Sequence, residues 1–292
     1  MPYENLKYEK EDGFAIITLN RPQALNAMNW QMEKEIDDVL DEVRNDDDVK
    51  VFIFTGAPRP DGRPCFSAGG DLREYAHGEK YKGGADKEMY KSGAEHLRGE
   101  SFPVSSPAMA LWSQRKWRLS IHGQKMPNIV WSPKISIAAV DGVCTAGGIE
   151  LACSCDIILA SETAQFSDMH VKNLGQIGGS AAATLLAWRI GVSRALQMCC
   201  TGEPIDGKEA YRIGLANEVY PPDKLLDGAK TLARKMAAMR PLALTMTKAT
   251  CNSIRDMGFN ESWLYSDACL YAMLAEPDTP DWGASRWVDR ER

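Results

Sequence analysis

Residues 141–156 read DGVCTAGGIELACSCD, and this stretch decides how the chain folds. Small residues run from Thr145 to Gly148, a single carboxylate follows at Glu150, and an apolar run begins at Leu151. Glycine lets a backbone approach a ligand closely, and the first turn of a helix carries unpaired N–H groups. We therefore predict that a helix begins within this stretch and that its first turn faces a ligand.

The composition is that of an ordinary globular protein. The chain has 292 residues, of which 44% are hydrophobic and 25% charged, so it is long enough to bury a sizeable core. The net charge of −6 argues against nucleic acids and membranes as partners, because both attract basic surfaces. No apolar run approaches the ~18 residues that span a bilayer, and the N-terminus has no signal-peptide core. We expect a cytoplasmic protein.

The eight cysteines show no CxxC pair and no spacing typical of a disulfide framework. This usage indicates reduced, buried thiols. No cluster of His, Cys and Asp has the spacing of metal ligands, so we expect no metal.

Turn signals and hydrophobic periodicity predict a mixture of strands and helices. Asp12-Gly13 lies between two strand-like runs and predicts an opening hairpin, and Asn29 is placed to cap a helix. Strands are predicted at 49–56, 135–140, 156–161 and 215–220, and helices near 106–120 and at 180–191, 193–200 and 205–214.

The pattern places an α/β core at residues 1–221, with a long irregular segment at 76–134. From residue 222 to 292 the pattern is helical throughout. Leu264, Leu270 and Met273 are among the apolar positions of this helical region, which we expect to bury a surface against other subunits.

Two predicted turns before helices are rich in small residues: FSAGGD at 66–71 and CTAGGIE at 144–150. If they faced each other, two N–H groups would point at one oxygen and form an oxyanion hole. Neither turn has the GxGxxG or GxxxxGK[ST] pattern of a phosphate-binding loop. Spacing alone leaves open that both turns are purely structural.

Four segments together resemble the crotonase superfamily of enoyl-CoA hydratases and isomerases. They are LNRPQALNAM (19–28), FSAGGDL (66–72), IAAVDGVCTAGGIELACSCDIILASETAQF (137–166) and TGEPIDGKEAYRIGLANEVYP (201–221). The resemblance covers most of residues 5–225 in the family's order. It implies a spiral of ββα units with a C-terminal helical region that builds trimers or dimers of trimers. It also implies an acyl-CoA thioester as substrate, an enolate-type oxyanion, and no cofactor beyond that CoA.

The resemblance also implies roles for individual residues. Ala68 and Gly147 match the two backbone donors of the oxyanion hole, and Glu150 matches the first catalytic glutamate of the hydratases. The coenzyme A moiety would lie against Ala24, Ala68, Gly69, Gly70 and Asp71. Arg21 and Arg73 either meet its phosphates or are surface charges.

The second hydratase glutamate is missing, and His170 occupies its place in FSDMHVKNLGQIGG. Imidazole suits proton transfer near neutral pH. Alternatively, His170 bonds only to loop backbone or to Asp168, or the local alignment slips by one residue and places Val171 there. The nearby Asp156 and Glu162 are expected to be structural or exposed.

These departures favour hydration of an enoyl-CoA. One base and an oxyanion hole also suffice for a C–C bond hydrolase or lyase acting on a β-keto or cyclic acyl-CoA, and a catalytically silent acyl-CoA-binding subunit is a third reading. Three tryptophans of the 76–134 segment either line the acyl pocket, which would suit a bulky or alicyclic group, or pack the segment itself: Trp112, Trp117 and Trp131.

Overall fold

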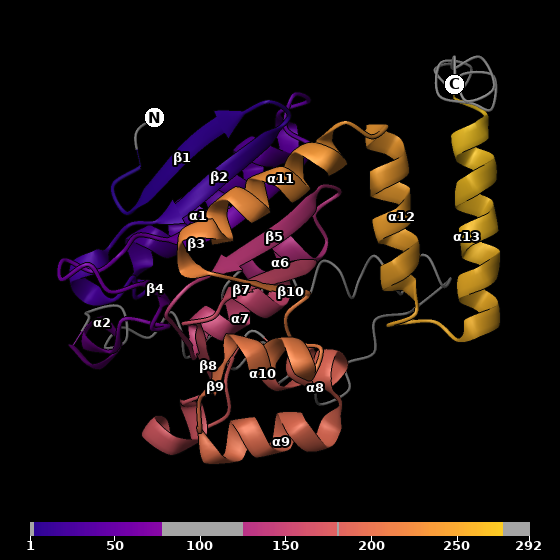
Figure 1. Cartoon of the computed structure of the whole chain (residues 1–292). Helices are drawn as coiled ribbons and strands as arrows, with labels where there is room; N and C mark the ends of the chain where they lie inside the picture. The colour runs from indigo at the N-terminus through magenta and orange to yellow at the C-terminus, as the bar shows by residue number, and fades with distance from the viewer. Residues whose placement is uncertain (1–2, 78–124, 180, 277–292) are drawn as a thin grey trace.

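The computed structural model describes residues 3–77, 125–179 and 181–276. Its larger sheet has six strands in the order β1-β2-β3-β5-β7-β10 (Figure 1). These are β1 (Leu6–Glu11), β2 (Phe14–Leu19), β3 (Val51–Gly56), β5 (Ile135–Val140), β7 (Ile157–Ser161) and β10 (Glu218–Tyr220). Only the hairpin β1–β2 is antiparallel, and each of the other neighbouring pairs is parallel.

The smaller sheet has the order β4-β6-β8-β9. Its strands are β4 (Cys65–Ser67), β6 (Val143–Thr145), β8 (Gln165–Ser167) and β9 (Ile205–Asp206). The first three are parallel to one another, and each follows directly along the chain from a strand of the larger sheet. This alternation between two sheets is the spiral of ββα units that the sequence predicts.

Helices connect and cover the two sheets. In chain order they are α1 (Trp30–Asn45), α2 (Leu72–His77), α6 (Lys125–Val130), α7 (Gly147–Ser154), α8 (Ala182–Ile190), α9 (Val192–Thr201), α10 (Gly207–Arg212), α11 (Leu225–Ala237), α12 (Pro241–Ser253) and α13 (Phe259–Leu274). Short turns of helix lie at η1 (Pro22–Ala24), η2 (His170–Leu174) and η3 (Pro222–Lys224), of which η2 is a π-helix.

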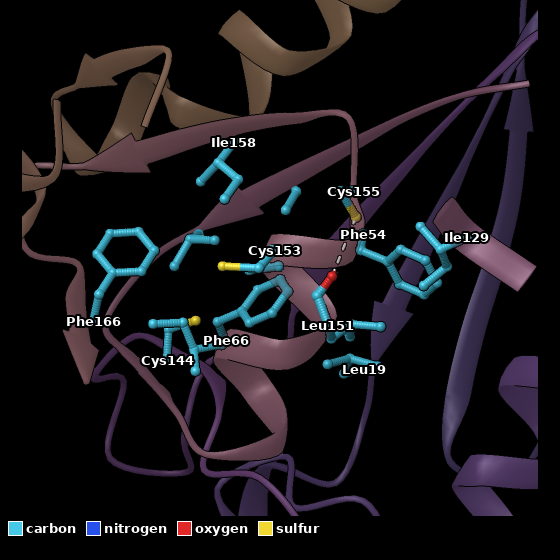
Figure 2. Packing of buried hydrophobic residues seen from close by; sticks show 14 of the residues in the cluster. Leu19, Phe54, Phe66, Ile129, Cys144, Leu151, Cys153, Cys155, Ile158 and Phe166 are labelled. Atoms are coloured by element: carbon cyan, nitrogen blue, oxygen red, sulfur yellow. Dashed lines mark hydrogen bonds between the residues drawn. The ribbon is translucent and has the colours of Figure 1, made fainter. Parts of the chain in front are cut away.

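Both faces of the larger sheet are buried, as expected for a parallel sheet. Successive side chains of a strand point to opposite faces, so Ile17 and Phe52 join the core that reaches the smaller sheet, whereas Ile16 and Val51 face α11. Figure 2 shows the first of these cores, where side chains of both sheets meet those of α7: Phe54, Phe66, Cys144, Leu151, Cys153, Ile158 and Phe166.

The expected boundary after residue 221 does not separate α11 from the core. This helix lies across the six-stranded sheet (Figure 1) and buries Leu225, Ala229, Ala233 and Ala237 there. The four residues recur every fourth position, so they form one narrow stripe. Three of these residues are alanines, and their small side chains let the helix pack closely against the strands.

Most of the predicted elements are confirmed. Asn29 caps α1 by accepting a hydrogen bond from the Met32 N–H. The strand predicted at 215–220 is shorter, because the N–H groups of Leu215 and Ala216 donate to the Ala210 carbonyl and close the end of α10 before β10 begins. The helix predicted near 106–120 lies outside the described residues, as do Trp112 and Trp117.

Helix α13 has many apolar residues that do not form a single stripe, and it stands apart from the sheets beside α12 (Figure 1). Leu264 and Tyr271 are 70% and 71% exposed, and Trp263 is 60% exposed, although Cys269 is buried. A helix of this composition is normally covered on every face. No helix in the part of the chain that the structure describes has the length and apolar character needed to cross a bilayer.

Lys248 ties α12 to the core. Its side chain is 5% exposed, and its ammonium donates to the carbonyls of Ile129 and Lys134 at 3.2 and 3.0 Å. It also pairs with the Asp156 carboxylate at 2.8 Å. Burial lowers the pKa of Lys248 and the charge of Asp156 opposes that shift. Asp156 is therefore structural, as expected, and its neighbour Glu162 makes only an exposed pair with Lys208.

We expect removal of the lysine from each of these two pairs to lower the free energy of unfolding by different amounts. Lys248→Met leaves buried carbonyls and a carboxylate without their cation, so we expect it to lower the free energy of unfolding by roughly 3 kcal/mol. Lys208→Met breaks an exposed pair and is expected to cost about 0–1 kcal/mol. Urea unfolding at one fixed protein concentration measures both variants. Equal losses in the two variants would contradict the structural role of Lys248.

Candidate functional site

Three parallel strands of the smaller sheet end at one edge, and the predicted site residues follow them. The turn after β4 carries residues 68–71, α7 begins after β6, and residues 168–170 follow β8. The register pairs Thr145 with Ser167, and the Ser167 hydroxyl donates to the Thr145 hydroxyl at 2.9 Å. The carboxyl end of parallel strands is where α/β proteins place ligands, so this edge is the candidate site.

Met28 holds the turn after β4 through its backbone. Its N–H donates to the Gly69 carbonyl at 2.7 Å, and its carbonyl accepts from the Asp71 N–H at 2.9 Å. These are the two bonds of a parallel bridge between Met28 and Gly70. In such a bridge the residue between the two bonded neighbours turns its own N–H the other way. The N–H of Gly70 therefore points away from Met28.

The hydrogen bonds of this turn leave a different backbone N–H available from the one that the sequence predicts. Ala68 was expected to supply an N–H, but that group donates to the Leu25 carbonyl at 3.0 Å. The loop before Met28 lies against the turn and takes up this donor. The neighbouring Gly69 N–H is also engaged, by the Ser67 hydroxyl at 3.1 Å. The available donor of this turn is therefore the N–H of Gly70 and not that of Ala68.

Gly147 is the first residue of α7 and lies directly beside Gly70. A Cβ built on Gly147 would stand 3.3 Å from the Gly70 nitrogen and 2.7 Å from the Met28 methyl carbon. Within the described residues, no acceptor takes a hydrogen bond from the N–H of Gly70 or Gly147. The preceding Ala146 has φ +50° and ψ −122°, a strained conformation for a residue with a Cβ. This strain turns the start of α7 toward Gly70.

The loop at residues 20–28 is fixed to the same turn. Arg21 donates to the Ala27 carbonyl at 2.7 Å and pairs with Asp71 at 2.9 Å, so its charge is partly neutralised. The backbone of Ala24 closes this loop, donating to Arg21 and accepting from Ala27. Arg73 is exposed. Ala24, Gly69, Gly70 and Asp71, expected to contact coenzyme A, thus lie on two segments that hydrogen bonds and the Arg21–Asp71 pair hold together.

Glu150 lies in the first turn of α7, and its side chain is 8% exposed. A carboxylate here faces the positive end of the helix dipole. The sequence places the carboxylate three residues after Gly147, which is close to one helical turn, so both groups belong to the same end of α7.

His170 lies beside Glu150 and is the first residue of η2, which follows β8. Its Nε2 lies 3.8 Å from Glu150 Oε1, and its Nδ1 lies 2.6 Å from Asp168 Oδ1. The Asp168 side chain is 2% exposed, and its Oδ1 also accepts the backbone N–H of His170 at 3.1 Å. The slipped alignment is not supported, because the following Val171 is 39% exposed.

Gly178 closes the site on the side of the loop after η2. A Cβ at this position would lie 2.8 Å from His170 Nδ1 and 3.0 Å from Glu150 Oε1. The absence of a side chain at residue 178 therefore lets the imidazole and the carboxylate face each other. No group of three potential metal ligands occurs among the described residues.

Asp168 and His170 shift each other's pKa. The hydrogen bond to Asp168 raises the pKa of His170; burial opposes this shift, and the charges of Glu150 and Asp168 support it. Burial acts to raise the pKa of Asp168, but the hydrogen bonds from His170 outweigh it and hold that pKa below its usual value. The arrangement thus favours an imidazolium between two carboxylates.

Sequence reasoning missed two parts of this cluster. Asp168 was considered only as an alternative partner that would leave His170 without a catalytic role, and Gly178 was not singled out. The spacing Asp168-x-His170 was the available signal, because a short turn after a strand brings residues two positions apart into contact. For Gly178 no local signal distinguishes it from Gly175 and Gly179, where an added Cβ would meet no atom of the described residues within 4 Å.

Sequence comparisons connect this geometry with known proteins. Models of the enoyl-CoA hydratase/isomerase family match residues 121–280 and 14–112. A protein of Mycobacterium bovis named as a probable enoyl-CoA hydratase is 30% identical over 290 residues, covering 99% of this chain and 97% of the relative. The short-chain-enoyl-CoA hydratase of Clostridium acetobutylicum is 34% identical over 252 residues, covering 86% and 82%.

The fold is also similar to that of a solved enoyl-CoA hydratase structure. A crystal structure of an enoyl-CoA hydratase subunit from Geobacillus kaustophilus superposes with a TM-score of 0.77 at 28% identity, covering 99% of this chain and 97% of the other. The family models and the full-length relatives confirm the resemblance seen in the sequence. The chain belongs to the enoyl-CoA hydratase/isomerase family.

Proposed function

We propose that the protein adds water across the double bond of an enoyl-CoA thioester. The observation that carries this proposal is the arrangement at one sheet edge of two available N–H groups and an acid–base pair. The pair is Glu150 and His170, whose facing atoms lie 3.8 Å apart. The names of the full-length relatives agree with this class of reaction.

The N–H groups of Gly70 and Gly147 are the proposed oxyanion hole. A thioester carbonyl bound between them gains negative charge as a nucleophile attacks C3, because the electrons of the double bond move onto the carbonyl oxygen. Backbone donors and the positive end of α7 stabilise that charge without rearranging. The glycines suit this role because a side chain on Gly147 would occupy the space beside the Gly70 nitrogen.

Glu150 and His170 are the proposed base and acid. Glu150 takes a proton from water while the water oxygen bonds to C3. The enolate then takes a proton at C2 from His170, which restores the thioester carbonyl. Glu150 returns its proton to the imidazole, so the net change is the addition of one water. A carboxylate and an imidazolium in one site provide the required protonation states together.

Coenzyme A is proposed to lie along the loop at 20–28 and the turn at 68–71, the two segments that carry Ala24, Ala68, Gly69, Gly70 and Asp71. Arg21 already pairs with Asp71 at 2.9 Å. That pair supports a role in holding the loop to the turn more directly than a role in binding phosphate. No metal or further cofactor is part of the proposal.

The product identifies the reaction. Straight-chain and alicyclic enoyl-CoA and β-keto acyl-CoA thioesters are incubated with the enzyme, and we expect a mass gain of one water on an intact enoyl-CoA. Glu150→Gln keeps the shape of the residue but removes the base, so kcat should fall by ~10²–10⁴-fold with little change in KM.

Glu162→Gln is the matched control, since Glu162 makes only an exposed pair with Lys208. Its rate should equal that of the wild type. Release of free CoA, or a ring-opened acid, would contradict hydration in favour of thioester hydrolysis or C–C cleavage. Binding without turnover of any thioester would indicate a silent acyl-CoA-binding subunit.

The oxyanion hole is tested by deleting a donor. Gly147→Pro removes the N–H at the first position of α7, and Gly147→Ala is the matched control, because its Cβ enters the same space beside the Gly70 nitrogen but its N–H is kept. We expect turnover of the proline variant to fall by about 10²–10³-fold. Because proline also restricts Ala146, the melting temperature and the affinity for a saturated acyl-CoA are measured alongside. An intact fold with a rate within twofold of the wild type would exclude Gly147 from the mechanism.

We also propose that the protein is a trimer or a dimer of trimers in which α13 is covered by another subunit. The exposed apolar residues of this helix support the proposal, and Leu264 is 70% exposed. Light scattering of the wild type should give three or six chains. Leu264→Glu should yield smaller species, whereas Asn260→Glu adds the same charge at the polar start of the helix and should not. A stable wild-type monomer at micromolar concentration would contradict the proposal.

A further inference from the structure

Asp168 is a buried carboxylate that the proposed reaction has not yet used. It follows β8 directly, and its side chain is 2% exposed. One oxygen, Oδ1, takes two hydrogen bonds from His170, one from the ring at 2.6 Å and one from the backbone at 3.1 Å. The Cys199 thiol of α9 also acts to lower the pKa of this carboxylate. Asp168 is therefore a buried carboxylate that is bonded to both the ring and the backbone of His170.

We infer that Asp168 is a positioning residue that fixes His170 with Nδ1–H bonded to the carboxylate and Nε2 directed at Glu150, so that the imidazole delivers its proton from Nε2. This inference rests on the proposed hydration.

The chemistry of the two side chains determines where the proton sits. An ionised carboxylate only accepts hydrogen bonds, so the Nδ1 that lies 2.6 Å away must carry a hydrogen. The remaining nitrogen is Nε2, and in the cation it also carries a hydrogen. Asp168 thus excludes the neutral tautomer with its hydrogen on Nε2, and it leaves Nε2 as the atom that gains or loses a proton.

The ionisable groups around the ring all favour the cation. Glu150 faces it from α7 and Asp168 from the end of β8, and both raise the pKa of His170. The Cys199 thiol reaches the same carboxylate from α9. Burial raises its pKa, as does its hydrogen bond to Asp168, so it stays neutral. Among the described residues, these groups together shift His170 toward its protonated form.

The positioning also accounts for completion of the cycle. After C2 has taken the Nε2 proton, the neutral imidazole keeps Nδ1–H on Asp168 and presents a lone pair at Nε2. Glu150 then carries the proton that it took from water, at an oxygen 3.8 Å from Nε2. Transfer of that proton to Nε2 restores both groups. A ring that turned over between the two steps would present Nδ1–H instead and could not accept it.

The test is Asp168→Asn, which keeps the shape of the side chain but removes its charge. His170 then loses the partner that raises its pKa, and the Nε2–H neutral tautomer becomes accessible. At neutral pH, kcat should fall roughly 10- to 100-fold, less than the ~10²–10⁴-fold contribution of a general acid, with KM nearly unchanged. His170 must be protonated to act. The limb of the kcat profile that falls as pH rises should therefore move to lower pH, and acidic buffer should recover part of the rate.

Three variants complete the design. Asp141→Asn is the matched control, because Asp141 follows β5 and binds only the hydroxyls of Ser161 and Thr163; its pH profile should match the wild type. Asp168→Glu restores the charge and should restore the position of the limb. If Asp168 acts through His170, the double variant Asp168→Asn/His170→Gln should be no slower than His170→Gln alone.

The imidazole is also followed by NMR titration, with His170→Gln assigning its signal. A lowered His170 pKa in Asp168→Asn, together with the shifted limb, supports the inference. An unmoved pH profile with a reduced melting temperature would show that Asp168 only stabilises the fold, and it would leave the proposed hydration intact. If the wild type hydrates no thioester, the proposed function fails. The titration then decides alone, and an unchanged His170 pKa overturns the inference.

Discussion

The close approach of two backbone segments at Gly70 and Gly147 is the constraint on which the rest of the site depends. A Cβ on Gly147 would lie 2.7 Å from the Met28 methyl carbon, and one on Gly69 would lie 2.8 Å from the Gly147 nitrogen. These contacts exclude ordinary side chains from both segments. The two N–H groups share one space only because the segments touch, so the composition of the turns follows from the chemistry of the pocket and not from the needs of a turn alone.

The smaller sheet fixes the positions of these two backbone segments. Its parallel strands stop within one residue of one another, and side-chain bonds such as Ser167 to Thr145 fix their register. A slip of one residue would turn every side chain to the opposite face. Asp168 and His170 would then move away from Glu150 together. The larger sheet forms the core: one of its apolar faces packs against α11, and the other faces the smaller sheet.

Local sequence patterns predict much of this fold because they report local physics. Asp12-Gly13 marks the hairpin, Asn29 caps α1, and the β-rich runs become parallel strands. The position of α11 was missed because its stripe of alanines is as consistent with a subunit contact as with a sheet face. The donor at Gly70 was missed for a related reason. Whether the N–H of Ala68 or of Gly70 is available depends on bonds to Leu25 and Met28, which are some 40 residues away in the chain.

In the proposed mechanism His170 stands where the resemblance implies a second glutamate, and Asp168 is the additional carboxylate beside it. A histidine alone beside Glu150 would be opposed by burial, which favours its neutral form, and either nitrogen could carry the hydrogen. Asp168 resolves both difficulties, because its charge offsets the effect of burial and its single oxygen binds the ring and the backbone of the same residue. In the proposed mechanism the pair of Asp168 and His170, and not His170 alone, therefore takes the place of that glutamate.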